Sequence, residues 1–295
     1  MRCVVGYTAT ERGRDALNLA CAIARSRGAE LDLVMVEPES SPYTAVYPPE
    51  TGFHDLLGEQ LQAWLGAALA MVPADVTARG HIRRADSDAR GLIDAALEFD
   101  AGLIVVGAAR NGLFKRFTVG SVANALLHAA PVPVALAPLG YNRTAAFTRI
   151  TCAVGDRPGI DDVLDEGVRS AVRAKLPLRL VSLVELDEPS GQGGVLEQTR
   201  LHVKERMSNA VALAAGKTEV SMAVAHGRTI ENAIDEMDFD DGEILVIGSS
   251  RLAEHNRLFL GATAAKVLRS LPIPMVVVPR SDTADGTAAA SGAVL

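Results

Sequence analysis

The chain has few cysteines, and no group of residues has the spacing of metal ligands. Cys3, Cys21 and Cys152 are far apart in the sequence and lie in apolar segments, which excludes a disulfide framework and predicts reduced, buried thiols in a cytosolic protein. The histidines show no His-x-x-x-His spacing, and no Cys-x-x-Cys pair occurs, so no metal site is expected.

The chain also lacks an excess of positive charge. Its 29 Lys and Arg residues are outnumbered by 36 Asp and Glu residues, and no basic cluster offsets the net charge of −7, so a nucleic-acid partner is not expected. No apolar run approaches the roughly 18 residues that a membrane span requires. The N-terminus lacks a signal-peptide pattern. These absences predict a cytoplasmic protein with no membrane partner.

The motifs of the common catalytic sites are missing. There is no Gly-x-Ser-x-Gly nucleophile elbow. Gly216-Lys217-Thr218 imitates the end of a P-loop, but Val211 occupies the position of the required glycine and a strand follows instead of a helix. The chain is therefore not expected to be an enzyme.

One pattern is present twice. A buried strand leads into a loop, the loop ends at a glycine that opens a helix, and a strand introduced by Pro-x-Pro follows. Each part of the second copy lies 141 positions after its counterpart, which predicts two domains in the 295 residues. The copies occupy residues 103–107, 120–121 and 131–138 in the first half and residues 244–248, 261–262 and 272–279 in the second.

Around this repeat, five strands alternate with helices in each half, which predicts an α/β fold with parallel sheets covered by helices on both faces. We expect a first domain over residues 1–138, a linker over 139–149 and a second domain over 150–280. Residues 281–295, rich in Ala, Gly, Ser and Thr, are expected to form a disordered tail. The strands are predicted at 2–6, 31–36, 76–82, 103–107 and from 131 on, then at 150–154, 178–184, 219–225, 244–248 and from 272 on.

Several helix features are also predicted. Gly28 should end the first helix, and Asp86 or Asp88 should cap the helix that runs to about residue 98. Ser121 is either a plain helix N-cap or part of a ligand site. A helix after residue 52 should bury one face, formed by Leu57, Leu61, Trp64, Leu65 and Ala68.

A ligand crevice is expected where the first and fourth strands lie side by side. There the loops 7–12 and 108–120 would converge at the carboxyl ends of the strands. Gly120 opens a helix, whose N-terminal N–H groups can hold a phosphate. The plainer interpretation is that Gly107 is only a turn and that Gly120 relieves helix packing.

The repeat resembles the universal stress protein family, as a tandem two-domain member. The resemblance covers nearly the whole chain and implies two tandem five-stranded parallel-sheet domains, doubly wound with strand order 3-2-1-4-5. The fifth strand commonly forms the dimer contact in this family, so the two domains are expected to pack as an intramolecular pseudo-dimer. The ATP-binding members carry Gly, two residues, Gly, nine residues, and then Gly followed by Ser or Thr.

This chain matches that motif in part. In the first half Gly107, Gly120 and Ser121 match, but Arg110 replaces the middle glycine. The arginine either blocks the phosphate cradle or holds a phosphate with its guanidinium fork. Gly112, two residues later, can supply the flexibility that Arg110 lacks.

The second half departs further from the motif. Gly248 and Gly261 match, Arg251 replaces the middle glycine, and Ala262 replaces the hydroxyl residue. Where ATP-binding members carry an Asp in the first loop, this chain has Thr8 in its first half and either residue 155 or residue 156 in its second.

The resemblance implies a stress-response module that binds an adenine nucleotide, ATP, in its first domain, with a degenerate site in the second. The backbone of Val36 would contact adenine, although its side chain is more typical of plain core. The alternative is a stress protein that binds no nucleotide and acts as a structural module or binds a protein partner, including a second copy in a homodimer. Slow ATP hydrolysis rests on fold analogy alone.

Overall fold

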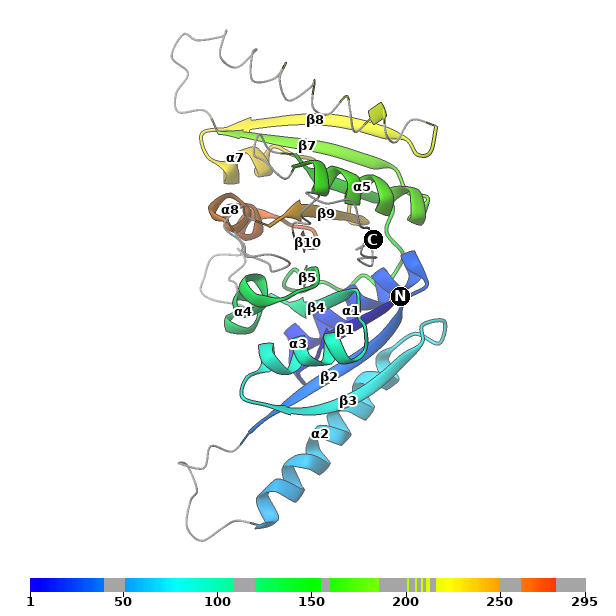
Figure 1. Cartoon of the computed structure of the whole chain (residues 1–295), viewed down its shortest axis with the longest axis vertical. Helices are drawn as coiled ribbons and strands as arrows, with labels where there is room; N and C mark the ends of the chain where they lie inside the picture. The colour runs from blue at the N-terminus through cyan, green and yellow to red at the C-terminus, as the bar shows by residue number, and fades with distance from the viewer. Residues whose placement is uncertain are drawn as a thin grey trace, which may run out of the picture.

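The computed structural model describes residues 1–39, 51–108, 120–154, 160–185, 216–249 and 261–279, with the single helical residues 201, 205, 208, 211 and 212. Figure 1 shows two halves joined through the middle of one sheet. Two predicted tandem α/β domains are therefore present, each with five strands.

The first half begins with a strand whose bounds are those predicted from the sequence. Its helices are α1 (Glu11–Arg27), α2 (Thr51–Met71), α3 (Asp88–Glu98) and α4 (Ser121–Ala129). Its strands are β1 (Arg2–Gly6), β2 (Glu30–Pro38), β3 (Ala78–Ala85), β4 (Leu103–Gly107) and β5 (Val134–Ala137).

The second half repeats this alternation. Its described helices are α5 (Ile160–Ala174), α7 (Ile230–Asp235) and α8 (Ala262–Ser270). Its strands are β6 (Arg149–Ala153), β7 (Leu178–Glu185), β8 (Val220–Gly227), β9 (Glu243–Gly248) and β10 (Met275–Val278).

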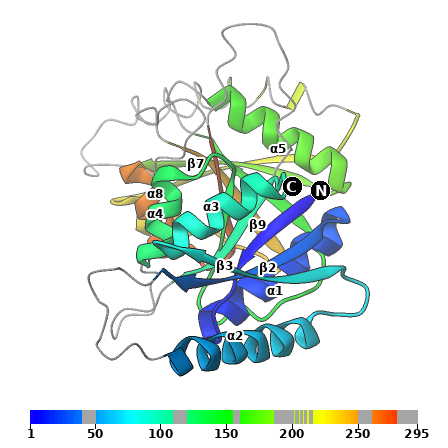
Figure 2. The ribbon, with the colours of Figure 1, turned by 60° about the horizontal axis from the view of Figure 1, so that its bottom comes forward.

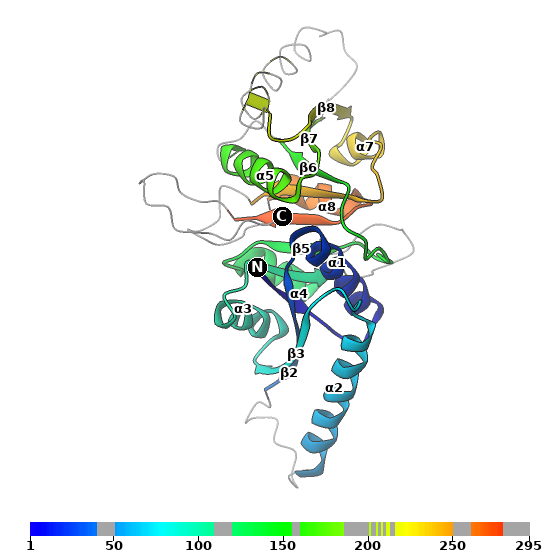
Figure 3. The ribbon, with the colours of Figure 1, turned by 90° about the vertical axis from the view of Figure 1, so that its right-hand side faces the viewer.

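The ten strands form one sheet in the order β3-β2-β1-β4-β5-β10-β9-β6-β7-β8. Each half therefore has the order third, second, first, fourth, fifth, which is the order that the family resemblance implies. Neighbouring strands are parallel except at the seam, where β5 and β10 pair antiparallel with Ala135 opposite Val276. Figure 3 shows β5 at the junction of the two halves, as expected for an intramolecular pseudo-dimer.

Helices cover both faces of the sheet, and each face has its own apolar core. Residues of α1, α2 and α5 form one core with the strands, and residues of α3, α4, α7 and α8 form the other. Figure 2 shows β2 and β3 lying between α1 and α2 on one side and α3 and α4 on the other. Both cores extend across the seam, so the halves share buried surface.

Local sequence explains several helix ends. Gly28 ends α1 in the left-handed conformation at φ 64°, which a residue without a Cβ adopts readily, and this confirms its predicted role. The cap of α3 is different from the prediction. Ser87 is the N-cap and accepts a hydrogen bond from the Arg90 N–H, whereas the sequence favoured Asp86 or Asp88.

Two further expectations were wrong. Ser121 is the first residue of α4 and not its cap, because Gly120 occupies the N-cap position. Trp64 is 40% exposed, although Leu61, Leu65 and Ala68 on the same helix are buried as predicted.

The three cysteines are free and buried, as predicted from their apolar surroundings. Burial raises the pKa of the Cys3 and Cys152 thiols to about 12 and that of Cys21 to about 11. Within the described ranges, no helix is long and apolar enough to cross a membrane.

Candidate functional site

The candidate site lies at the carboxyl ends of β1 and β4, which are parallel neighbours with Cys3 opposite Leu103 and Val5 opposite Val105. The chain leaves β1 toward α1 on one face of the sheet and leaves β4 toward α4 on the other. In a doubly wound sheet this divergence opens a ligand crevice between the two connections. The two strands are therefore neighbours as predicted, whereas residues 109–119 of the second loop lie outside the described part of the chain and the convergence of the two loops stays a prediction.

The loop after β1 folds back tightly on the first turn of α1. The Thr10 N–H donates to the Thr8 carbonyl at 2.7 Å, and the hydroxyls of the two threonines are hydrogen-bonded at 2.8 Å. A Cβ on Gly13 would overlap the Thr8 carbonyl oxygen, so this contact requires glycine. Thr8 itself is exposed and lies just beyond the carboxyl end of β1.

The end of β4 lies directly under the same helix turn. A Cβ on Gly107 would overlap the carbonyl oxygen of Arg12, a backbone atom that cannot rotate away. Beyond Gly107, the Ala108 N–H continues the ladder by donating to the Ala137 carbonyl at 2.9 Å. Gly107 and the Thr8 loop are therefore held together through the first turn of α1.

The other wall of the crevice begins with α4. Gly120 has φ −63° and ψ 162°, and no side chain caps the helix. The first N–H groups of a helix have no partner within it and carry partial positive charge, so they favour an anion. Ser121, exposed at the first position, adds a hydroxyl to this end.

Val36 lies on β2, beside β1 at the same edge of the sheet. Its side chain packs against α3, where a Cβ on Gly91 would lie 2.8 Å from the Val36 Cγ2. The side chain therefore belongs to the core, in agreement with the plainer interpretation of the sequence, and only its backbone groups can serve a ligand.

Three predicted site residues lie outside the described part of the chain. Arg110 and Gly112 fall in the loop 109–119, and Arg251 falls in the corresponding loop 250–260. Their proposed roles stay predictions.

The second half builds the corresponding edge differently. Gly248 faces the side chain of Val163 on α5, where Gly107 faces helix backbone in the first half. The strand pairings align Cys3 with Ile150, since these residues lie opposite Leu103 and Ile244, which are themselves 141 positions apart. In this register Thr8 corresponds to residue 155 and not to residue 156.

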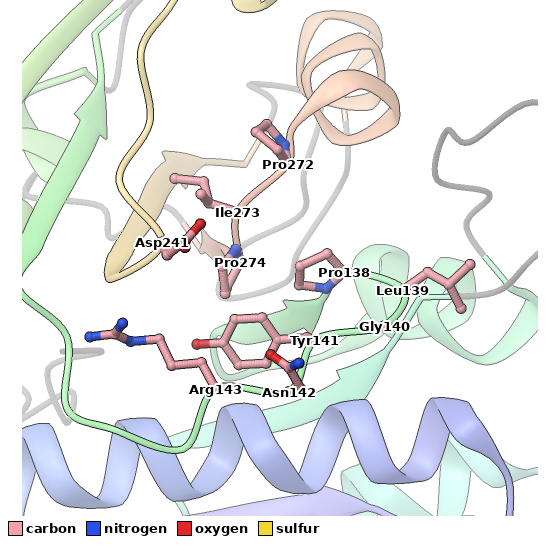
Figure 4. A pocket seen from close by; sticks show the side chains of 10 residues that line it. All are labelled: Pro138, Leu139, Gly140, Tyr141, Asn142, Arg143, Asp241, Pro272, Ile273 and Pro274. Carbon is pink, nitrogen blue, oxygen red and sulfur yellow. The ribbon is translucent and has the colours of Figure 1, made fainter.

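Sequence analysis missed a second feature, a cavity of about 430 Å³ at the seam between the halves. It is lined by residues of the expected linker, including Tyr141 and Arg143, and by Asp241 of the second half (Figure 4). No sequence pattern connects Asp241 with Tyr141, because the two lie a hundred positions apart and only the fold brings them together.

Among the described residues, no three His, Cys, Asp or Glu side chains are grouped so that they could hold a metal ion. At the carboxyl ends of β1 and β4, the described groups that a ligand could meet are the N-terminal N–H groups of α4 and the hydroxyls of Thr8 and Ser121. Such groups suit an anion.

Comparison with known proteins places the chain in one family throughout. The universal stress protein family model matches residues 1–138 and again residues 146–279. Universal stress proteins of Mycobacterium tuberculosis and Mycobacterium bovis are each 29% identical over 292 residues, which cover 95% of this chain and all of the relative.

Solved structures show the same fold. A universal stress protein from Archaeoglobus fulgidus superimposes with a TM-score of 0.69 at 18% identity, covering 95% of this chain and 98% of the other. A putative universal stress protein from Pseudomonas aeruginosa gives a TM-score of 0.59 at 18% identity, covering 95% and 94%.

Proposed function

The chain belongs to the universal stress protein family, and from this premise we propose that it is a stress-response protein that binds an adenine nucleotide, ATP, in its first half. The nucleotide occupies the crevice at the carboxyl ends of β1 and β4. Its phosphates lie against the N-terminus of α4, and its base lies near the backbone of Val36. The second half has a degenerate site.

The observation that supports this proposal best is a pair of close backbone contacts that the first turn of α1 makes, one with the loop after β1 and one with the end of β4. Gly13 against Thr8 and Gly107 against Arg12 leave no room for a side chain on either glycine. The loop and the strand end are thereby held in fixed positions, so a ligand meets preformed backbone groups. In the second half the Val163 side chain stands at the equivalent place, which favours the first half as the site.

Calorimetric titration of the full chain with ATP tests the proposal. Gly120→Glu adds a carboxylate at the N-terminus of α4, where it competes with the phosphates, and should abolish binding. Gly261→Glu, the same change at the corresponding position of α8, is the matched control and should leave binding intact. No heat from the wild-type chain at millimolar ATP, or equal loss in both variants, would contradict the proposal.

A variant of Arg110 separates its two possible roles. If the guanidinium holds a phosphate, Arg110→Gly weakens ATP binding by about tenfold or more, since charge-assisted hydrogen bonds are lost. If the side chain blocks the cradle, the same change restores the family's glycine and tightens binding. If Arg110 holds a phosphate, Arg251→Gly in the second half should leave ATP binding unchanged.

The alternative function is a partner-binding or structural module without nucleotide. The arginine that replaces the middle glycine in both halves favours it, because both sites then depart from the motif in the same way. Under this alternative, protein purified from its source carries no nucleotide. Mass spectrometry of the denatured protein distinguishes the two functions. Slow ATP hydrolysis would be a further activity, and it would require phosphate release from ATP that Gly120→Glu abolishes.

A further inference from the structure

The seam cavity has a floor from one half and a roof from the other. Tyr141 and Arg143 come from the segment that follows β5, and Asp241 precedes β9. In Figure 4 the Tyr141 hydroxyl and the Arg143 guanidinium lie together on one side, and the Asp241 carboxylate lies on the opposite side. The cavity is separate from the nucleotide crevice, whose walls are the connections after β1 and β4.

The floor of the cavity is held in place along α1. The Gly140 N–H donates to the Asp15 carboxylate at 2.9 Å, and the Asn18 side-chain amide donates to the Tyr141 carbonyl at 2.9 Å. Asp15 is itself buried, and burial raises its pKa. The hydrogen bond from Gly140 partly offsets the cost of burying this carboxylate. Tyr141 is therefore fixed before any ligand arrives.

Within the described part of the chain, two polar groups in the cavity wall are buried and have no hydrogen-bond partner. The Tyr141 side chain is only 9% exposed, and its hydroxyl has no partner. The Arg143 Nε is likewise buried and unpaired, while Nη2 of the same side chain donates to the Ala146 carbonyl at 3.2 Å. Buried polar groups are nearly always paired in native proteins, so two orphans at one cavity point to a missing acceptor.

Both orphans are donors at neutral pH. Burial raises the pKa of Tyr141 to about 12, which keeps the phenol protonated, and a guanidinium is always charged. A carboxylate accepts from both groups at once.

The charges around the cavity are balanced. Arg143 faces Asp241 across the space, and Asp240, which precedes Asp241 in the chain, is not among the residues that line the cavity. The Asp240 carboxylate accepts from the Gly242 N–H at 2.7 Å and from the Thr148 hydroxyl at 3.2 Å, and these hydrogen bonds, followed by the charges of Arg149 and Arg143, lower its pKa. One carboxylate, that of Asp241, lines the roof and disfavours a polyphosphate. Together with Arg143 on the other side, it favours a ligand that carries one negative and one positive group.

Apart from Asn142, the remaining wall has no polar side chain, and its proline rings suit a small aliphatic group. The proline rings that line the cavity are Pro138, Pro272 and Pro274. A volume of about 430 Å³ lies within the usual range of small-molecule sites.

We propose that the seam cavity is a second ligand site that binds a small aliphatic zwitterion of the free α-amino acid class. The ligand carboxylate accepts from the Tyr141 hydroxyl and the Arg143 Nε, its ammonium group faces Asp241, and its side chain packs on the prolines. Because both halves line the cavity, such a ligand bridges the seam.

Calorimetric titration of the full chain with L-leucine tests this site, with 4-methylpentanoate and 3-methylbutylamine as probes that lack the ammonium and the carboxylate. Tyr141→Phe removes one hydroxyl that has no partner, so it should leave the thermal midpoint unchanged and weaken leucine binding about tenfold. Asp241→Asn should weaken leucine binding but not 4-methylpentanoate binding. Glu59→Gln, the same loss of charge on α2, is the control and should change neither.

Three outcomes would overturn the site: no heat with L-leucine at millimolar concentration, leucine affinity unchanged in Tyr141→Phe, or inorganic phosphate that binds more tightly than leucine. Titration with ATP keeps the two proposals distinguishable. Tyr141→Phe should leave ATP affinity unchanged, and Gly120→Glu should leave leucine affinity unchanged.

Discussion

Arg2 and Asp32 form a two-pronged ion pair at the end of the sheet opposite the crevice. Asp32 is 1% exposed and accepts from Arg2 Nε at 2.8 Å and from Nη2 at 2.7 Å. The His81 Nε2 lies 2.9 Å from the same carboxylate. The buried charge is thus fully surrounded by polar partners, which is the condition under which a buried carboxylate is tolerated.

The second half keeps the arginine and relocates the acid. Arg149 corresponds to Arg2, but its partner is Glu243 on β9 at 2.6 Å, and Arg179 occupies the position of Asp32 in the strand register. Glu243 also accepts from the Thr151 hydroxyl. The two halves therefore conserve the chemistry of the cluster while the acid moves from the second strand to the fourth.

Removing the Asp32 charge should destabilise the first half. Asp32→Asn leaves Arg2 without its charge partner and should lower the free energy of unfolding by about 3 kcal/mol. Urea unfolding followed by Trp64 fluorescence measures this, since the single tryptophan lies in the first half. Asp94→Asn is the matched control: its pair with Arg90 is exposed, so the change should stay below about 0.5 kcal/mol. Equal effects would contradict the assigned role.

Two glycines should respond in opposite ways to alanine. Gly107→Ala puts a methyl group against the Arg12 carbonyl and should cost about 2 kcal/mol of stability. Gly66→Ala on α2 meets open space and should stabilise by about 0.5–1 kcal/mol, because alanine is the better helix former. Chemical unfolding of both variants checks this, and a tolerated Gly107→Ala would mean that α1 can move off β4.

The buried thiols predict a loss of stability at alkaline pH. Their folded pKa values, about 11 to 12, lie above the ordinary value of 9, so above pH 9 the unfolded chain releases protons that the folded chain keeps. Stability is therefore full below pH 9 and falls as pH rises toward 12, by about 1.4 kcal/mol per pH unit for each thiol. Urea unfolding under reducing conditions measures the slope, and Cys3→Ala should make it shallower by one thiol. An unchanged slope would contradict the burial of Cys3.

The order of strands and helices could be predicted from the sequence because it depends on patterns of residues that are close together in the chain. The strand bounds of β1, the left-handed Gly28 and the duplicated glycine frame all follow from residues close together in the chain. The helix cap at Ser87 was missed because three neighbouring residues, Asp86, Ser87 and Asp88, are all good caps, and only the backbone conformation selects one.

The seam cavity could not be predicted for a different reason. Tyr141 and Asp241 line the same cavity only because β5 pairs with β10. No sequence pattern indicates that these two residues lie close together in space. The candidate nucleotide site could be predicted in part. Its glycines form a pattern in the sequence. The contact of Gly13 with Thr8, which holds the loop, could not be predicted, because Gly13 looks like an ordinary residue within a helix.

The continuous sheet predicts that the two halves unfold together. Glu243→Gln removes a buried charge in the second half, far from Trp64 in sequence, and should lower stability by about 3 kcal/mol. If the seam couples the halves, the Trp64 fluorescence midpoint in urea shifts to the same extent as the circular dichroism midpoint, and both remain single transitions. Independent halves would instead leave the Trp64 midpoint in place and split the circular dichroism curve in two. Coupled unfolding is expected because the apolar core on each face contains side chains from both halves, so exposing one half removes packing from the other.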